Sequence, residues 1–174
     1  MRTEQKRANR EFYYSTLRTS DFKLWICGKD NRIVALGFTS QSVKKVKEAG
    51  YSICDNSAKL EIIIKEVKEY LDGNRKQFSI IPLFLKGTKF QIKVWKKLLE
   101  IPYGERVTYG KLAKMIGNKK AVRAVGQACG KNPIAIVVPC HRIVASNGCL
   151  GGYSAGLDIK KKLLLIEDVN SHKA

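Results

Sequence analysis

The sequence predicts an α+β protein of two parts, an N-terminal antiparallel sheet with a helix and then a mainly helical half. The first half alternates short strand-like runs with turns and holds one amphipathic helix. The second half carries helical apolar stripes that are separated by Gly and Pro. The chain has 174 residues, which is enough for one medium domain or two small ones.

Four runs in the first half are typical of strands. Residues 10–18 and 21–28 are rich in aromatic and aliphatic side chains, and the turn at 28–32 leads into the apolar run 33–38. This order predicts an antiparallel meander. Residues 77–83 predict a further short strand.

Residues 55–74 predict the helix of this half. Asn56 or Ser57 can cap its start, and Gly73 can end it. Its apolar side chains follow the spacing of one buried helical face. They are Leu60, Ile63, Ile64, Val67 and Leu71.

The sequence pattern changes at the segment LKGTKF, from alternating strands and a helix to successive helical stripes, so we place the domain boundary there. We expect an N-terminal domain over 1–84, a linker over 85–88 and a C-terminal domain over 89–174. The second domain opens with a helix that Pro102 and Gly104 end. Its apolar stripe consists of Phe90, Val94, Leu98 and Ile101.

Two short helices joined by a Gly-containing turn predict a helix-turn-helix. Thr108 can cap the first, which carries Leu112, Ala113 and Ile116. The segment GNK is the turn, and the second helix is expected from about Lys119 to Cys129. Residues 156–169 predict a closing helix.

The charge of the chain is strongly positive, with 33 Lys and Arg against 15 Asp and Glu, a net +18. Residues 86–131 hold twelve basic side chains and only Glu100 and Glu105 as acids, a net +10. Such a segment favours a polyanionic partner, foremost nucleic acid, over a general role in solubility. We expect an intracellular protein without a membrane segment, because no signal-peptide core and no long apolar run is present.

The five cysteines do not predict a disulfide framework, because their number is odd and their spacing irregular. A pair between Cys27 and Cys54 stays open. With two histidines and no Cys-x-x-Cys motif, no zinc site is expected.

The second helix of the helix-turn-helix is rich in Ala and Gly. Val122, Val125 and Cys129 should face the core, while Arg123 and Gln127 point outward. A helix with small side chains is thin enough to enter an opened minor groove, but small residues serve close helix packing equally well. Arg123 favours a role inside the DNA duplex.

Residues 133–148, PIAIVVPCHRIVASNG, combine apolar sequence with reactive groups. Ile134 to Val138 predicts a buried strand, which Pro139-Cys140-His141-Arg142 interrupts. A His beside a Cys can make the thiolate that nucleophilic chemistry needs, although a buried structural Cys is an alternative. The carboxylates available to orient the His are Asp158, Glu167 and Asp168.

These motifs together resemble the O6-alkylguanine-DNA alkyltransferases. The resemblance rests on RAVGQA, NPIAIVVPCHRIV and GGYSAGL, and on GTKFQIKVWKKLLEIPYGERVTYGKLA before them. It is dense over 86–168, and the first 85 residues match only loosely. It implies an RNase H-like N-terminal domain and a winged helix-turn-helix C-terminal domain.

The resemblance also implies roles for individual residues. Cys140 would accept the alkyl group, His141 would deprotonate it through a water, and Glu167 would orient His141. Tyr109 would donate a proton toward the departing guanine, and Asn132 would brace the reactive turn. Arg123 would fill the gap left by a flipped nucleotide. The further DNA-binding residues would be Thr108, Ala124, Gln127, Lys119 and Lys120. The substrate pocket would be lined by Tyr109, Pro139, Ile143, Tyr153, Ser154 and Ala155.

The function so implied is single-turnover transfer of an alkyl group from O6-alkylguanine, with O4-methylthymine a lesser substrate, in duplex DNA to Cys140. We expect a monomer without cofactor or metal, which binds DNA from the minor-groove side in the cytoplasm, or in the nucleus of a eukaryote. A winged-helix regulator with a structural or redox-sensing cysteine is the first alternative. A cysteine hydrolase is the second, but it leaves the charge unexplained.

Overall fold

The computed structural model describes residues 11–171, which form two compact units. The first unit contains residues 11–68 and 78–86, and the second contains 69–77 and 87–171. Within the described residues no helix is both long enough and apolar enough to cross a membrane.

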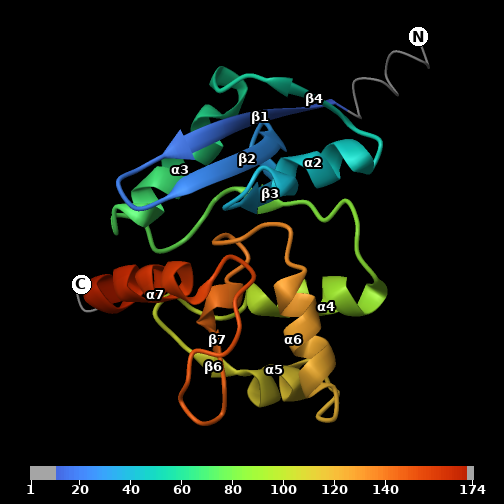
Figure 1. The fold of residues 1–174 in the computed structure, drawn as a ribbon, viewed down its shortest axis with the longest axis vertical. Helices are drawn as coiled ribbons and strands as arrows, with labels where there is room; N and C mark the ends of the chain where they lie inside the picture. The colour runs from blue at the N-terminus through green and yellow to red at the C-terminus, as the bar shows by residue number, and fades with distance from the viewer. Residues whose placement is uncertain (1–10, 172–174) are drawn as a thin grey trace. The chain divides into compact units, whose positions relative to one another are not determined.

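A five-stranded sheet is the centre of the first unit (Figure 1). Its strands stand in the order β4-β1-β2-β3-β5. Their bounds are Glu11–Arg18 (β1), Lys23–Lys29 (β2), Arg32–Gly37 (β3), Ser52–Asp55 (β4) and Ile81–Pro82 (β5). The predicted antiparallel meander is β1 to β3, whereas β4 and β5 pair in parallel at the two edges. Parallel pairing follows because a helix carries the chain back before each edge strand.

The helix α2, Gln41–Glu48, and strand β4 were not predicted from the sequence. Only Val43 and Val46 of α2 are buried, and the lysines around them hide the helical period. Both valines pack with Phe12, Cys27 and neighbouring side chains on one face of the sheet.

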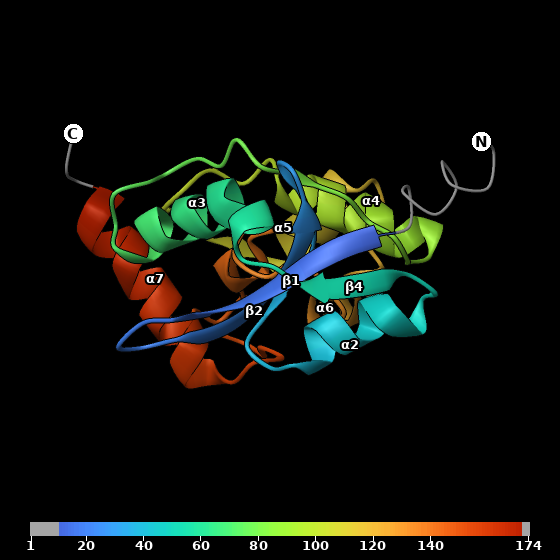
Figure 2. The ribbon, with the colours of Figure 1, turned by 90° about the horizontal axis from the view of Figure 1, so that it is seen from above.

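The helix α3, Glu61–Leu71, lies on the opposite side of the strands from α2 (Figure 2). A Cβ atom built on Gly28 of β2 would stand 2.8 Å from Cδ1 of Ile63, so the helix approaches the sheet where the strand lacks a side chain. Leu60, at the end of the preceding 3₁₀ turn Ala58–Leu60, is fully buried with Ile63.

Asn56 is the residue that caps this helical segment. Its Oδ1 accepts a hydrogen bond from the Lys59 N–H, and Ser57 makes no such bond. Gly73 ends the segment in the left-handed region, at φ +75°. Of the predicted buried face, Ile64 is only half-buried, and the sequence reading missed the fully buried Tyr70.

The second unit is mainly helical (Figure 1). Its helices are Lys89–Leu98 (α4), Tyr109–Met115 (α5), Val122–Gly130 (α6) and Leu157–Ser171 (α7), with the 3₁₀ turn Cys140–Arg142 (η2). Two short strands, Val107–Thr108 (β6) and Ile143–Val144 (β7), pair in parallel. Helices α4, α5 and α6 pack against one another around Trp95, whose Nε1–H donates to the Ala128 carbonyl at 2.8 Å.

Helix starts in this unit follow their capping residues. Thr88 and Gln91 form a capping box on α4, and the Thr108 hydroxyl caps α5 by accepting from the Lys111 N–H. Helix α6 starts at Val122, three residues later than predicted. The four residues before it form a turn that the Ala121 N–H closes on the Asn118 carbonyl.

The predicted strand over Ile134 to Val138 is wrong. The segment is buried but forms tight turns, in which the Val137 N–H bonds the Ala135 carbonyl. Ile136 adopts φ +69°, which a branched side chain rarely does. Burial was therefore predicted correctly, but an apolar run alone does not distinguish a strand from a buried turn.

Candidate active site

A short 3₁₀ turn presents the thiol of Cys140. Pro139 before it has no N–H and takes φ −81° and ψ 60°, so the strand-like path ends and the chain turns. The Cys140 N–H donates to the Val138 carbonyl at 2.8 Å, and the residue is 6% exposed. Its side chain is thus held, almost fully buried, on a turn that a backbone hydrogen bond closes.

Asn132 links α6 to this turn. Its Nδ2 donates to the Val138 carbonyl at 2.8 Å and lies 3.1 Å from Sγ of Cys140, while its Oδ1 accepts from the Ile134 N–H at 3.0 Å. Burial raises the pKa of the Cys140 thiol, and the hydrogen bond from Asn132 lowers it in part. The thiol is therefore protonated before the reaction, and the N–H of Asn132 Nδ2 can stabilise the thiolate once it forms.

The buried carboxylate of Glu167, on α7, accepts several hydrogen bonds in the interior of the unit. It accepts from Tyr70 Oη at 2.6 Å, from the Gly104 N–H at 3.2 Å, and from both Nε and Nη2 of Arg142. His141 Nε2 lies 3.0 Å from its Oε1. Burial alone would raise the pKa of this carboxyl, but the hydrogen bonds from His141 and Arg142 and the charge of Arg142 lower it to about 2. Glu167 is a carboxylate at neutral pH.

The protonation of His141 follows from this network. Burial lowers its pKa although Glu167 opposes the shift, so the imidazole is neutral at pH 7. A carboxylate can only accept hydrogen bonds, so Nε2 carries the imidazole proton, and this N–H donates a hydrogen bond to Glu167. Nδ1 is buried and has no hydrogen-bond partner among the described residues. It therefore presents a free lone pair, which is what a base requires.

Sequence reasoning missed two members of this network. Arg142 is 6% exposed and also donates to the Ile101 carbonyl at 2.6 Å. A buried Arg requires a carboxylate, so its place within an apolar run was a usable signal for the pair with Glu167. Tyr70 comes from the first half of the sequence, and its apolar helical position gave no sign of a polar role.

Lys160 is a third buried polar residue that the sequence did not indicate. Its Nζ donates to the carbonyls of Ile143, Leu150 and Gly152, and the residue is fully buried. Burial lowers the pKa of this ammonium group. The bonds fasten the loop after β7 to helix α7.

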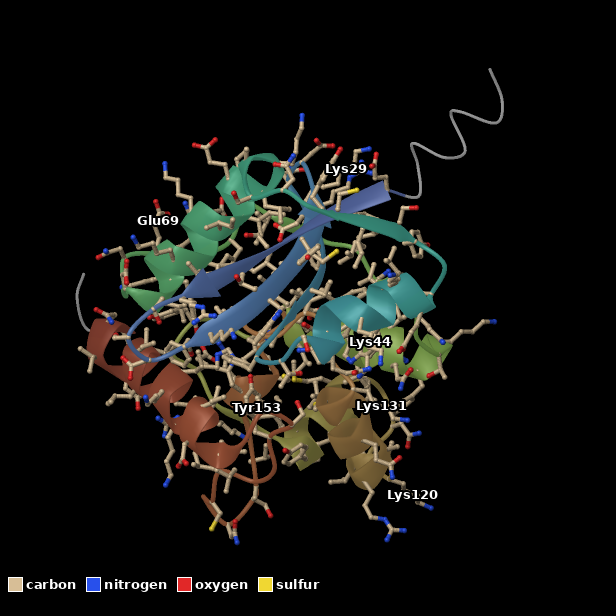
Figure 3. All side chains as sticks on the ribbon, turned by 45° about the horizontal axis from the view of Figure 1, so that its top comes forward. Lys29, Lys44, Glu69, Lys120, Lys131 and Tyr153 are labelled. Carbon is tan, nitrogen blue, oxygen red and sulfur yellow. The ribbon has the colours of Figure 1, made fainter. Side chains whose placement is uncertain are left out.

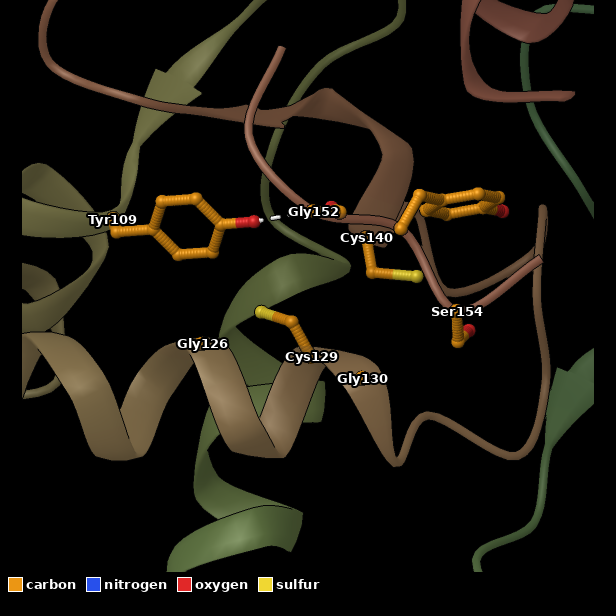
Figure 4. A pocket seen from close by; sticks show the side chains of 8 residues that line it. Tyr109, Gly126, Cys129, Gly130, Cys140, Gly152 and Ser154 are labelled. Atoms are coloured by element: carbon orange, nitrogen blue, oxygen red, sulfur yellow. Dashed lines mark hydrogen bonds between the residues drawn. The ribbon is translucent and has the colours of Figure 1, made fainter. Parts of the chain in front are cut away.

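A pocket of about 170 Å³ opens above Cys140 (Figure 4). Tyr109 forms one wall and donates from Oη to the Gly152 carbonyl at 3.3 Å. The full lining is Tyr109, Gly126, Cys129, Gly130, Cys140, Gly152, Tyr153 and Ser154.

Three of the residues predicted for the pocket are not part of its lining. Ile143 is fully buried in β7, and Pro139 is buried at the start of the reactive turn. Ala155 is half-buried in the loop beyond Ser154. Gly126, Gly130 and Cys129 take their places, so the small residues of α6 also give room to the pocket, and the Tyr109 ring lies over Gly126.

The exposed face of α6 carries Arg123, Ala124 and Gln127. Val122 was expected in the core but is 40% exposed, because the helix starts at this residue and its side chain precedes the first packed turn. Lys119 and Lys120 are exposed in the preceding turn. In Figure 3, Lys120 and Lys131 extend from the two ends of this helix into solvent.

The geometry brings together Cys140, His141, Glu167, Asn132, Tyr109, Tyr153 and Ser154 in one unit. It keeps Thr108 at the start of α5, with its oxygen used as a cap. Within residues 11–171 no group of three His, Cys, Asp or Glu side chains could hold a metal ion.

Two family models match the chain. The DNA binding domain of 6-O-methylguanine DNA methyltransferase matches residues 89–169, and the ribonuclease-like domain of the same proteins matches residues 12–85. Together they cover both units, including the half whose resemblance was loose in the sequence.

Named relatives and solved structures agree with these models. A methylated-DNA–protein-cysteine methyltransferase of Methanosarcina acetivorans is 42% identical over 89% of this chain and 97% of that protein. The inducible protein of the same name in Bacillus subtilis is 38% identical over 89% of each chain. The crystal structure of Mycobacterium tuberculosis OGT in complex with DNA has a TM-score of 0.79 at 33% identity, over 92% of this chain and 94% of that one. The chain therefore belongs to the 6-O-methylguanine DNA methyltransferase family, and the resemblance seen in the sequence is confirmed.

Proposed function

We propose that the protein repairs duplex DNA by moving the alkyl group of an O6-alkylguanine onto Sγ of Cys140. One observation carries this proposal: a buried thiol at a pocket, with a free imidazole nitrogen on the next residue. The relatives' name, methylated-DNA–protein-cysteine methyltransferase, describes the same chemistry.

The transfer begins with the proton of the thiol. His141 Nδ1 takes it through a water, and the carboxylate of Glu167 stabilises the imidazolium that forms. The thiolate then attacks the alkyl carbon, so an S–C bond forms as the C–O6 bond breaks. The electron pair of that bond stays on O6, and the departing guanine gains a proton from Tyr109, whose Oη lies at the pocket.

Each protein molecule acts once in this scheme. The product is a thioether, and an alkyl–sulfur bond does not hydrolyse at neutral pH. The protein is thus consumed in proportion to the lesions it removes, with O6-methylguanine as the primary substrate and O4-methylthymine a lesser one.

The reaction requires the damaged nucleotide to leave the base stack, since O6 lies inside the duplex. The exposed face of α6 is suited to the minor groove, because Ala124 adds little bulk beside Arg123. Arg123 occupies the space of the extruded nucleotide, and Gln127 and Lys120 contact the backbone. The loop with Tyr153 and Ser154 then covers the base. A monomer suffices, and it works where the DNA lies, in the nucleoid or a nucleus.

Mass spectrometry after incubation with a duplex containing one O6-methylguanine tests this function. We expect one methyl group per protein, on the tryptic peptide 132–142 that carries Cys140. A Cys140→Ser variant should bind the same duplex and stay unmodified, and Cys149→Ser, which changes an exposed cysteine, should be methylated as usual.

If the wild-type protein binds the lesion but stays unmodified, the proposed alkyl transfer is refuted, and a DNA-binding regulator becomes the better interpretation. Methylation of any other residue at full yield would remove Cys140 as the acceptor.

A further inference from the structure

A second thiol, that of Cys129, lines the same pocket as Cys140 and has no part in the proposed alkyl transfer. It comes from the last turn of α6, whereas Cys140 comes from the 3₁₀ turn η2. Figure 4 shows the two side chains on facing segments of the pocket wall.

Asn132 makes a hydrogen bond to each of the two cysteine residues. Its backbone N–H donates to the Cys129 carbonyl at 3.1 Å, and its side chain reaches Sγ of Cys140 at 3.1 Å. The charge of a Cys140 thiolate also acts on Cys129, whose pKa is raised to about 12 by burial and by that charge. Asn132 therefore contacts both residues. In Figure 4 the two sulfurs point in different directions, so a bond between them requires both side chains to turn toward each other.

Of the five cysteines, Cys129 and Cys140 are the two that line this pocket. Cys149 is exposed and does not line the pocket, and Cys27 and Cys54 belong to the first unit.

We propose that Cys129 and Cys140 form a dithiol site that hydroperoxides convert to an internal disulfide. Sγ of Cys140 attacks one peroxide oxygen, the O–O bond breaks, and Cys140 becomes a sulfenic acid while one water or alcohol leaves. Sγ of Cys129 then attacks Sγ of Cys140, so the S–S bond forms, the S–O bond breaks, and the second water leaves. Two thiols are oxidised and one peroxide is reduced.

Cys140 is the first sulfur oxidised, because the donor Asn132 Nδ2 stabilises its thiolate. The disulfide stops oxidation short of the irreversible sulfinic acid, and a thiol reductant restores both groups. The consequence for repair rests on the proposed function: the oxidised protein cannot accept an alkyl group until it is reduced.

Peptide mapping of the full-length protein, treated with hydrogen peroxide and digested without reductant, tests the bond directly. Trypsin separates all five cysteines, and cleavage after Arg123, Lys131 and Arg142 releases peptides 124–131 and 132–142. We expect these two peptides to be joined, with the loss of two hydrogen atoms. Protein methylated beforehand by lesion DNA should not form the joined pair.

Reactivation supplies the second measurement. After peroxide and then reductant, wild type and Cys149→Ser should regain most of their own untreated methyl acceptance. Cys129→Ser, compared with its own untreated sample, should regain at least about 10-fold less, because its sulfenic acid proceeds to the sulfinic acid. Phenylarsine oxide, which bridges two close thiols, should form a one-to-one adduct that Cys129→Ser lacks.

Sulfinic acid on Cys140 without the joined peptides, or equal reactivation of Cys129→Ser, would overturn the dithiol site. The two proposals fail separately. Joined peptides in a protein that never accepts a methyl group would refute the repair function alone, and methyl acceptance without joined peptides would refute the dithiol alone.

Discussion

At the scale of single residues, the candidate site depends on which atoms donate and which accept. Asn132 offers Nδ2 to the Cys140 sulfur and Oδ1 to the Ile134 N–H. An amide meets both needs at once, because its nitrogen only donates and its oxygen only accepts. The sequence alone, with Asn before Pro, allowed an ordinary turn residue as well.

Exchange of this amide for a carboxylate should slow alkyl transfer. In Asn132→Asp the donor to sulfur is lost and a negative charge stands beside the thiol, which raises the pKa of Cys140 further. We expect the single-turnover rate on O6-methylguanine duplex to fall at least about 10-fold, corresponding to 1.4 kcal/mol or more.

Asn147→Asp is the matched control for this change. Asn147 Oδ1 accepts from the Cys149 N–H in an exposed turn, and a carboxylate can do the same. An equal loss of rate in both variants would contradict the role assigned to Asn132.

Glu167 should make the stability of the protein depend on pH in the acid range. Its pKa falls from 4.5 in the unfolded chain to about 2 in the fold, so folding favours the carboxylate. The stabilisation is complete above about pH 5 and is lost as pH falls toward 2, on the order of 3 kcal/mol in total. Urea unfolding of the wild type at pH 6 and pH 3 should show a loss of about 2 kcal/mol of this total, since pH 3 still lies above the folded-state pKa.

Glu167→Gln should remove that pH dependence and also destabilise the protein at pH 6 by about 3 kcal/mol, because Arg142 loses its buried partner. The control is Asp168→Asn on the same helix. Its carboxylate is half-exposed and pairs with Arg106 at the surface, so a small change at both pH values is expected. Equal pH slopes in wild type and Glu167→Gln would contradict the assignment.

At the scale of elements, the loop after β7 is held by helix α7 rather than by its own sequence. The ammonium group of Lys160 donates to three carbonyls of the segment 143–152, and Tyr109 holds Gly152 from the other side. Because this loop carries Tyr153 and Ser154, its position sets the shape of the pocket.

Lys160→Met should loosen this loop while keeping much of the side-chain volume. We expect faster amide hydrogen exchange in residues 150–156 and a single-turnover rate at least about 10-fold lower, since small displacements in a site are costly. Lys161→Met changes the exposed neighbour and should alter neither quantity. Unchanged amide hydrogen exchange in the Lys160→Met variant would mean that contacts other than those of Lys160 hold the loop in place.

The elements also show how far the sequence could be read. A capping residue located the start of α5, because Thr108 acts within a few residues. The buried run 134–138 was read as a strand, because its turns depend on tertiary contacts that the apolar pattern does not carry. The short helix α2 was missed for a related reason: its two buried valines are too few to mark a period.

The sequence predicted some residues of the site and missed others, again because a local pattern does not reveal tertiary contacts. Cys140 and His141 stand in one motif and were found together, whereas their partners are distant in sequence. Tyr70 reaches Glu167 across 97 positions, and nothing local marks such a contact. Family resemblance supplied Glu167, but only the structure reveals Arg142 as its charged partner.

At the scale of the whole molecule, the charge of +18 is concentrated where the proposal places DNA. The segment 86–131, with its net +10, contains α4, α5 and α6, and the exposed lysines 119, 120 and 131 flank the last of these. A phosphate backbone bound by such a surface releases counterions, so affinity depends on salt in a calculable way.

Binding to lesion-containing duplex should therefore weaken steeply as salt rises, while the chemistry does not. If four phosphates are neutralised, an increase from 50 to 200 mM monovalent salt should weaken binding about 100-fold. Alkyl transfer from a free O6-alkylguanine base, which carries no phosphate, should change less than about twofold over the same range. Fluorescence anisotropy with labelled duplex measures the first quantity, and mass spectrometry of the Cys140 peptide measures the second.

A double variant, Lys119→Ala with Lys120→Ala, tests the contribution of the basic surface. Its binding should depend less steeply on salt, and its rate of alkyl transfer from the free base should be unchanged. Salt-independent binding would mean that the basic surface serves solubility and that the duplex is held elsewhere.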